Sequence, residues 1–319
     1  MPELPEVQTV VDGLNMKVRG REITDVWTDY FSDSYIGKES IKDKKYFKKF
    51  KKEIIGQKIL KAERRAKNII IHLNGGKFLL IHLKMSGHLI YGDYKFNKKE
   101  DNWAPEKGYF DRKEIKKNPE MWGWIDKEPT RDPFNKFIHF VLTFTNGKQL
   151  VMSDLRKFGS IKLLNKKEVD ELKEKLGPEP LELKAKDFIE LVRKKGRGNA
   201  KTVLMNPEFI AGIGNIYSDE ILWEVGVHPE SSLQNLDDEK LKEILRVAKK
   251  ILKASIDIGG DSMSDFRNIE GRKGKYQGKH NAYGLDGTAC KKKNCDGVLE
   301  KKLINQRVGR FCVQHQKIY

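Results

Sequence analysis

The stretch Ala211-Gly-Ile-Gly-Asn-Ile-Tyr-Ser-Asp-Glu220 decides how the middle of the chain folds. Apolar residues at helical spacing across residues 202–227 predict two short helices joined at Gly212-Ile-Gly214, with the second beginning near Asn215. Backbone N–H groups at a helix N-terminus, together with an Asn side chain, suit a phosphate group, and glycines let that phosphate come close. An ordinary helical hairpin with a glycine turn is the alternative that these residues alone leave open.

Positive charge supports the phosphate interpretation. Lys201 lies just ahead of the first of these helices and can supply a cation to the same phosphate. The whole chain of 319 residues carries 63 Lys and Arg against 46 Asp and Glu, a net charge of +17. Such a surplus indicates a polyanionic partner, most simply nucleic acid, although lysine-rich surfaces also serve solubility alone.

The part of the chain before this stretch is β-rich behind a leading helix. Apolar spacing over residues 3–18 predicts the helix. Two later segments, residues 68–83 and 137–153, each contain two apolar runs, which are separated by Asn74-Gly-Gly76 and by Asn146-Gly147. Such turns between short apolar runs predict β-hairpins. With 38% hydrophobic residues, the chain can bury more than one core.

Residues 91–136 separate the two hairpins and carry three of the five tryptophans and four of the ten prolines. This composition predicts an ordered insertion, to which the sequence assigns no chemistry. Helical patterns then follow at residues 166–176, 187–195 and 237–257. The chain therefore divides into a β-rich region, a helical region and a small Gly- and Lys-rich tail.

The tail contains all three cysteines of the chain, Cys290, Cys295 and Cys312, and His315 follows the last of them. Two ligand pairs, each in a tight turn, can close tetrahedrally on one Zn²⁺, and four protein ligands would make that zinc structural. The strands of a zinc ribbon would lie between the pairs. Three free cysteines and a surface histidine are the alternative. An odd number of clustered cysteines argues against a disulfide framework and for a reducing cytosol.

The N-terminus suggests a nucleophile. Removal of Met1 would leave Pro2 with a free secondary amine, and an α-amino group of pKa about 8 is partly neutral at neutral pH. Such an amine can attack a sugar C1′ atom, and Glu3 can donate a proton to the opening sugar or to the departing base. The alternative is structural, because Pro and Glu are common at the start of a helix.

Targeting features are few. No run of about 18 apolar residues predicts a membrane span, and Met1–Glu6 does not have the pattern of a secretory signal. A cytoplasmic, nucleoid-associated protein of bacterial type is therefore expected.

Taken together, six motifs resemble those of the formamidopyrimidine-DNA glycosylase/endonuclease VIII family, which excises oxidised bases. The motifs are Met1-Pro-Glu-Leu-Pro-Glu-Val7, Arg64-Arg-Ala-Lys67, His82-Leu-Lys-Met-Ser-Gly87, Asp154-Leu-Arg-Lys-Phe-Gly159, Ala211–Glu220 with Gly226-Val-His-Pro229, and Asn305-Gln-Arg307 ahead of Cys312. They follow the family's order and span the chain.

The resemblance implies an α+β multidomain protein. Residues 1–163 would form a catalytic β-sandwich domain with a leading helix, interrupted by an insertion at about residues 91–136. Residues 164–262 would form a helix–two-turn–helix DNA-binding domain. Residues 263–319 would form a base-capping loop and a zinc ribbon, in which the unusual Cys290/Cys295/Cys312/His315 set would hold one structural Zn²⁺.

The resemblance also implies residue roles. Pro2 would be the Schiff-base nucleophile and Glu3 the acid, while Lys67 and Arg307 would serve β- and δ-elimination and contact the phosphate beside the lesion. The remaining implied contacts are with DNA, through Met85, Arg156 and Phe158 in the space of the everted nucleotide and Lys201 and Asn215 on the backbone.

The expected function is that of a bifunctional DNA glycosylase/AP lyase, acting as a monomer on damaged double-stranded DNA. Arg156, Phe158 and the Leu4-Pro5 sequence favour oxidised purines, namely 8-oxoguanine and formamidopyrimidines, as substrates. Two alternatives stay open: excision of oxidised pyrimidines, and a DNA-binding relative without catalysis.

Overall fold

The computed structural model describes residues 1–263 and 265–319. The described chain forms two compact units. The first unit comprises residues 1–2, 6–170 and 259–274, with Ser264 outside the description, and the second comprises residues 3–5, 171–258 and 275–319.

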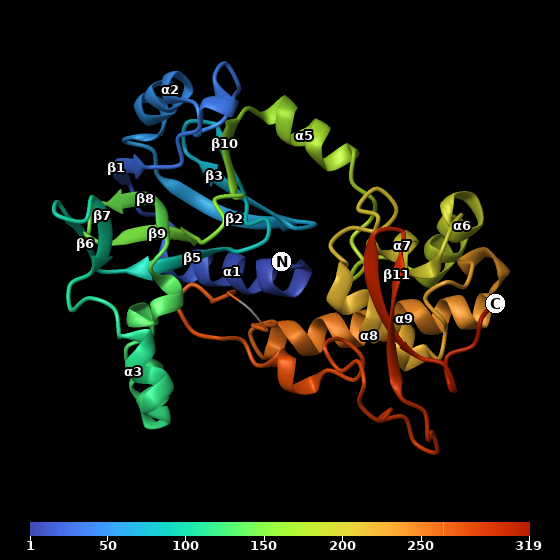
Figure 1. The fold of residues 1–319 in the computed structure, drawn as a ribbon. Coiled ribbons are helices and arrows are strands. Elements are labelled where there is room, and N and C mark those ends of the chain that lie inside the picture. Colours follow the sequence, from blue (N-terminus) through green and yellow to red (C-terminus); the bar gives the residue numbers. More distant parts are fainter. Residues whose placement is uncertain (264) are drawn as a thin grey trace. The chain divides into compact units, whose positions relative to one another are not determined.

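The first unit is built on two four-stranded antiparallel sheets (Figure 1). One sheet has the order β1-β8-β9-β5 and the other the order β10-β4-β3-β2. Their strands are β1 (Ile23–Thr28), β2 (Ile59–Arg65), β3 (Asn68–Leu73), β4 (Phe78–His82), β5 (Gly87–Gly92), β8 (Ile138–Phe144), β9 (Gln149–Asp154) and β10 (Ser160–Leu164). Both predicted hairpins are present, as β3–β4 and β8–β9.

A single apolar core joins the two sheets and helix α1 (Leu4–Lys17). Its buried members include Val7, Val10 and Leu14 of α1, Ile69 and Ile81 of one sheet, and Leu142 and Met152 of the other. Residues at this spacing along α1 share one helical face, which explains why the leading helix packs on the sandwich. Helix α2 (Lys44–Ile54) joins the same core through Phe50 and Ile54, and Asp43 caps its N-terminus by accepting a hydrogen bond from Tyr46 N.

The segment between β5 and β8 is folded. It contains a hairpin, β6 (Tyr94–Asn97) and β7 (Asn102–Pro105), then the short helices α3 (Arg112–Lys117) and α4 (Trp122–Lys127) and three 3₁₀ turns, η2 (Pro119–Met121), η3 (Pro129–Arg131) and η4 (Pro133–Asn135). Trp103 of β7 meets Trp27 of β1 edge to face, with ring centroids 6.4 Å apart, so the hairpin is anchored on the sandwich.

The second unit is helical and carries a β-hairpin. Its elements are α6 (Ala185–Lys195), α7 (Ala200–Met205), α8 (Asn215–Val225), η5 (Leu233–Asn235), α9 (Asp238–Asp257), η6 (Tyr276–Lys279), β11 (Leu299–Ile304) and β12 (Arg307–Cys312), while α5 (Lys166–Glu174) runs from the first unit into the second. Helix α8 begins at Asn215, as the sequence predicts, and ends at Gly226, whose φ of 71° only glycine adopts readily. Nearly all of α8 is buried, because α7, α9 and β12 surround it.

No helix among the described residues is long and apolar enough to cross a membrane. The three domain ranges predicted from the sequence, 1–163, 164–262 and 263–319, stay a prediction.

Candidate functional site

Two loops of the first unit lie next to each other because β5 pairs with β9. Gly87, where β5 begins, is the register partner of Asp154, where β9 ends. The loop before Gly87 carries Met85, and the loop after Asp154 carries Arg156 and Phe158. Three predicted DNA contacts, distant in sequence, thus belong to neighbouring loops.

The carboxylate of Asp154 holds these loops together. Its Oδ1 accepts a hydrogen bond from Ser86 Oγ at 2.6 Å, and its Oδ2 accepts from Tyr30 Oη at 2.8 Å and from Gly159 N at 2.7 Å. Asp154 is fully buried, and burial together with this carboxylate raises the pKa of Tyr30, which keeps its hydroxyl a donor. The buried carboxylate of Asp154 and its three hydrogen bonds therefore form a polar base that supports both loops.

The side chains above this base face solvent. Met85 is 42% exposed and Phe158 is 49% exposed. The Arg156 guanidinium lies over the Phe158 ring, 4.6 Å from its centroid. The arrangement offers two apolar side chains and one planar cation on fixed loops.

Lys67 occupies the turn between β2 and β3, where Ala66 has a φ of 55°. Arg64 fixes this turn, because its Nη1 donates to the Ala66 carbonyl at 3.0 Å and its Nε donates to Gln8 Oε1 of α1 at 2.9 Å. Burial, and the charges of nearby Lys84 and Lys67, lower the pKa of His82 to about 4, so this imidazole is neutral at pH 7. The Arg64–Gln8 hydrogen bond thus connects the Lys67 turn to α1, the helix that follows Pro2.

Pro2 belongs to the first unit and is buried at the start of α1. One turn later, Glu6 Oε1 accepts a hydrogen bond from Asp261 N at 2.7 Å. A Cβ atom added at Gly260 would lie 2.9 Å from the same carboxylate oxygen, so the chain after Gly259 runs close against α1.

Glu3 is held by the second unit. Its Oε1 accepts a hydrogen bond from Ile216 N, in the first turn of α8, at 2.9 Å, and Leu4 N donates to the Gly212 carbonyl at 3.0 Å. Gly212 has a φ of 94°, and a Cβ there would lie 2.8 Å from Leu4 Cβ. The start of α8, predicted as a phosphate site, therefore also binds the carboxylate of Glu3.

Lys201 is fully buried and forms an ion pair with Asp219, with Nζ 2.6 Å from Oδ1. The same ammonium donates to Ser218 Oγ at 3.1 Å, and Gly309 of β12 covers the lysine stem. Burial lowers the pKa of Lys201 and raises that of Asp219 to about 6. The predicted contact of Lys201 with a DNA backbone stays a prediction, because in this structure its ammonium serves Asp219.

Asn215 and Arg307, two other predicted site residues, also lie in the second unit. Asn215 is the first residue of α8, and its side-chain Oδ1 is buried without a hydrogen-bond partner among the described residues. Arg307 is exposed at the start of β12, after a tight turn in which Asn305 and Gln306 have φ values of 44° and 64°. The guanidinium therefore stands at the tip of the β11–β12 hairpin.

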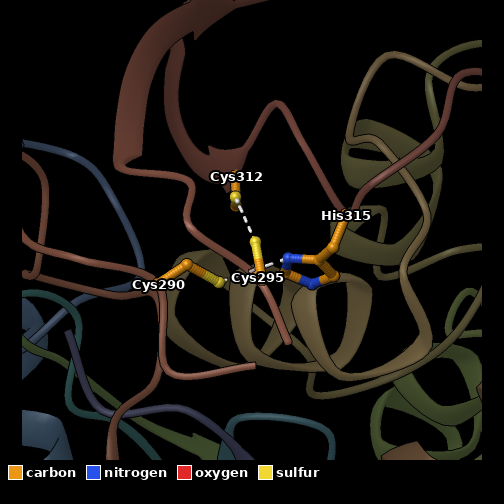
Figure 2. A group of neighbouring side chains, drawn as sticks. All are labelled: Cys290, Cys295, Cys312 and His315. Atoms are coloured by element: carbon orange, nitrogen blue, oxygen red, sulfur yellow. Dashed lines mark hydrogen bonds between the residues drawn. The ribbon is translucent and has the colours of Figure 1, made fainter. Parts of the chain in front are cut away.

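Cys290, Cys295, Cys312 and His315 converge, with all their ligand atoms within 4.8 Å of one another (Figure 2). The Sγ atoms of Cys295 and Cys312 are 3.6 Å apart, and Cys290 Sγ is 3.3 Å from His315 Nδ1. A disulfide needs about 2.05 Å between sulfurs, whereas tetrahedral sites with metal–sulfur bonds of about 2.3 Å separate sulfurs by nearly 4 Å. The cluster can therefore hold a metal ion.

Neighbouring groups orient this cluster. His315 Nε2 donates to the Trp223 carbonyl at 2.9 Å, which leaves Nδ1 facing the cysteines, the arrangement typical of a metal-bound histidine. A Cβ added at Gly297 would lie 2.5 Å from Cys312 Sγ, so a glycine is needed beside this ligand. Three sulfurs and one imidazole fit Zn²⁺ well.

The predicted site residues thus fall into two sets. The first unit holds Pro2, Lys67, Met85, Arg156 and Phe158, and the second holds Glu3, Lys201, Asn215, Arg307 and the four cluster residues. The sequence interpretation missed the residues that position these side chains, namely Ser86, Asp154, Arg64 and Asp219. All four lie inside motifs quoted above, so a polar residue within a motif was the signal that could have indicated them.

Comparison with known proteins decides the family. Residues 1–161 match the model of the formamidopyrimidine-DNA glycosylase N-terminal domain, and residues 176–267 match that of the formamidopyrimidine-DNA glycosylase H2TH domain. The chain belongs to the formamidopyrimidine-DNA glycosylase family.

Individual relatives of this family agree over the full length. The formamidopyrimidine-DNA glycosylase of Solibacter usitatus is 33% identical over 318 residues, covering 99% of this chain and 100% of that protein. That of Bacillus subtilis is 30% identical over 325 residues, covering 99% of each. Lactococcus lactis Fpg, solved in complex with DNA containing an abasic site, is 27% identical with a TM-score of 0.76 and covers 99% of both chains.

These findings confirm the predicted family, the DNA glycosylase class and the fold, which combines an N-terminal β domain, a helical domain and a C-terminal Cys₃His cluster.

Proposed function

We propose that this chain is a bifunctional DNA glycosylase/AP lyase that removes oxidised purines from double-stranded DNA. The observation that carries the proposal is the fixed N-terminus. Glu3 Oε1 accepts a hydrogen bond from Ile216 N and Leu4 N donates to the Gly212 carbonyl, so the two residues that follow Pro2 are each held by a hydrogen bond. A nucleophile needs such positioning, because a fixed near-attack geometry lowers the entropic part of the barrier.

Pro2 acts as the nucleophile once Met1 is removed. The lone pair of its secondary amine forms a bond to C1′ while the glycosidic bond breaks and its electron pair leaves with the base. Glu3 protonates the ring oxygen O4′ as the sugar opens, and the amine proton is lost, which leaves an iminium ion between Pro2 and C1′.

The iminium ion is the electron sink for strand cleavage. Loss of a C2′ proton and breakage of the C3′–O bond give β-elimination, and δ-elimination then breaks the C5′–O bond. Lys67 serves the first elimination and contacts the phosphate, and Arg307 contacts that phosphate and serves the second. The Arg64 bonds that fix the Lys67 turn, and the exposed hairpin tip that carries Arg307, support these roles.

DNA must be opened for this chemistry, since C1′ of a stacked nucleotide cannot be reached. Met85 and Phe158 enter the space of the everted nucleotide and Arg156 faces the orphaned base, roles that suit exposed side chains on rigid loops. Asn215 and Lys201 hold the DNA backbone, which for Lys201 requires that its ammonium be shared with Asp219.

One structural Zn²⁺ is the metal we assign to Cys290, Cys295, Cys312 and His315. A closed set of four protein ligands leaves no open position for substrate, so the ion would stabilise the ribbon rather than take part in the reaction. Its role for DNA is to keep the β11–β12 hairpin, and with it Arg307, in place.

The substrate class rests on Arg156 and Phe158. Related proteins support it, since Lactococcus lactis Fpg has also been solved with Fapy-dG containing DNA, with 27% identity and a TM-score of 0.75. The surplus of 17 positive charges suits a sequence-independent attraction to the phosphate backbone. We propose further that the protein works as a monomer in the bacterial cytoplasm, on the nucleoid.

Borohydride trapping tests this function. The parent protein, a duplex with a single 8-oxoguanine and sodium borohydride should give a covalent complex, because hydride reduces the iminium carbon C1′. Pro2→Gly should trap far less, and equal trapping would refute the nucleophile assignment. Mass spectrometry of the N-terminus checks that Met1 is absent.

Two comparisons separate the alternatives. Faster release of thymine glycol than of 8-oxoguanine would favour a pyrimidine-directed enzyme. Intact DNA binding without nicking of an abasic duplex would instead indicate a non-catalytic binder.

A further inference from the structure

The inserted segment holds another part of the first unit through a buried ion pair. We call residues 110–135 the insert and residues 265–274 the arm. Arg267 Nε of the arm donates to Asp132 Oδ2 of the insert at 2.9 Å, and the two side chains are 0% and 1% exposed. The Arg267 guanidinium also lies over the ring of Phe134, 4.8 Å from its centroid. Separating the two segments would leave a buried charge without its partner, which is strongly unfavourable.

A second contact works through Asn135, which is fully buried. Its Nδ2 donates to the Pro129 carbonyl at 2.8 Å and approaches the Gly271 carbonyl of the arm at 3.5 Å. His88 Nε2 donates to Asn135 Oδ1 at 2.9 Å, which fixes the orientation of the amide. Gly271 has a φ of +83°, and a Cβ there would lie 2.9 Å from both Asn135 Nδ2 and the Pro129 oxygen, so the arm fits only with glycine at this position.

The opposite side of the arm packs on the sandwich and on α1. Ile269 is buried in the main core, and a Cβ added at Gly13 of α1 would lie 2.3 Å from Ile269 Cγ2. Tyr91 N, near the end of β5, donates to the Ile269 carbonyl at 2.8 Å. The arm therefore lies between the insert and the helix that follows Pro2.

We propose that the insert is a clamp that holds the arm beside α1 and thereby sets how efficiently a damaged base is released. This inference rests on the proposed function, in which Pro2 attacks the sugar that carries the base. The base must then be accommodated close to α1, where the arm lies. An abasic sugar has no base to accommodate, so its cleavage does not need the clamp. Asp132 and Asn135 are positioning residues in this scheme.

The test compares two reactions in one variant. Asp132→Asn removes the charge of the pair but keeps an oxygen for the bond that Phe134 N donates to Asp132. We expect release of a formamidopyrimidine base to fall by about ten- to a hundredfold, as a small misplacement of substrate contacts does, while abasic nicking changes by less than about twofold. Hydrogen exchange of residues 265–274 should rise, and that of β8 and β9 should not.

The matched control is Asp111→Asn. Asp111 lies in the same insert and accepts a hydrogen bond from Lys113 N at the start of α3, and no hydrogen bond or ion pair described for its side chain reaches the arm. This variant should leave both reactions unchanged. If Asp132→Asn folds poorly, Gly271→Ala disturbs the same contact from the arm without leaving a charge unpaired, and it should shift the two reactions in the same unequal way.

Equal loss of both reactions in Asp132→Asn and Gly271→Ala would show a merely structural insert and overturn the inference, as would unchanged base release. A parent protein that neither releases bases nor nicks abasic duplexes would refute the proposed function instead, which separates the two failures.

Discussion

The hydroxyl of Ser86 donates to the carboxylate of Asp154 at 2.6 Å, across 68 positions of sequence, and ties together the loops that carry Met85, Arg156 and Phe158. Ser86 Oγ also accepts a hydrogen bond from Arg156 N at 3.1 Å, so one hydroxyl bridges both loops. Exposed apolar side chains are free to move unless their backbone is fixed, and this bridge fixes it.

Ser86→Ala should loosen both loops. The change leaves a buried carboxylate oxygen without its donor, which costs about 1–3 kcal/mol. We expect a lower melting temperature of the first unit and slower release of 8-oxoguanine, measured by thermal unfolding and by single-turnover kinetics. Ser34→Ala is the control, because Ser34 is an exposed serine of the same unit. Unchanged stability and rate in Ser86→Ala would mean that the loops do not depend on this bond.

Removal of the metal should unfold the ribbon selectively. Elemental analysis should find one zinc per chain, and a chelator should raise hydrogen exchange in β11 and β12 but not in the sheets of the first unit, because the ligands lie in the second unit alone. Cys312→Ala should lose zinc and DNA binding together. His315→Cys should keep zinc, since thiolate replaces imidazole as a ligand, whereas His315→Ala should bind it weakly. A DNA-competent protein without metal would contradict this prediction.

The buried pair of Lys201 and Asp219 separates a structural role from a DNA-binding one. Asp219→Asn leaves a buried ammonium poorly compensated and should destabilise the second unit by about 3–5 kcal/mol, measured by denaturant unfolding. The double variant Lys201→Met/Asp219→Leu should recover most of that stability, because an apolar pair of similar volume replaces the ions.

The same double variant tests the predicted contact of Lys201 with DNA. Its affinity for an abasic duplex should fall, and the salt dependence of binding should become shallower, because a phosphate contact is lost. Affinity equal to that of the parent would restrict Lys201 to a structural role.

The stability of the first unit should fall in mild acid because of His88. Burial lowers the pKa of His88 to about 4, below the value of 6.5 for an exposed imidazole. The folded state therefore favours the neutral form. Its contribution is complete above pH 6.5 and is lost as pH falls towards 4, by about 3 kcal/mol in total.

The comparison variant for this effect is His88→Gln, which keeps a donor for Asn135 but does not titrate. Denaturant unfolding at pH 7 and pH 4.5 should show a smaller loss of stability in the variant than in the parent. Parallel losses would indicate that other groups account for the acid sensitivity.

Local sequence was sufficient for much of the fold. The two hairpins, the start of α8 at Asn215 and the convergence of Cys290, Cys295, Cys312 and His315 were all predicted, because each depends on spacing within a short segment. Turn residues, helical periodicity and ligand spacing act over a few residues or one hairpin, so they can be recognised without knowing what packs on them.

Motif order identified the family as well, but the contacts of the insert could not be predicted from the sequence. Asp132 and Arg267 are 135 positions apart, and neither belongs to a family motif quoted above. Which charged residue of a lysine-rich chain becomes buried depends on how whole segments pack. Local composition therefore does not predict which one it is.

The sequence by itself thus determined the elements, the family and the chemical types of the candidate residues. Only the tertiary structure decided which of these side chains are held and by what. It placed the Glu3 carboxylate on Ile216 N, 213 positions away, the Lys201 ammonium on Asp219, and the insert on the arm. The physical reason is that a buried polar group must find its partner wherever the packed chain supplies one, and that partner is set by the fold as a whole rather than by neighbours in sequence.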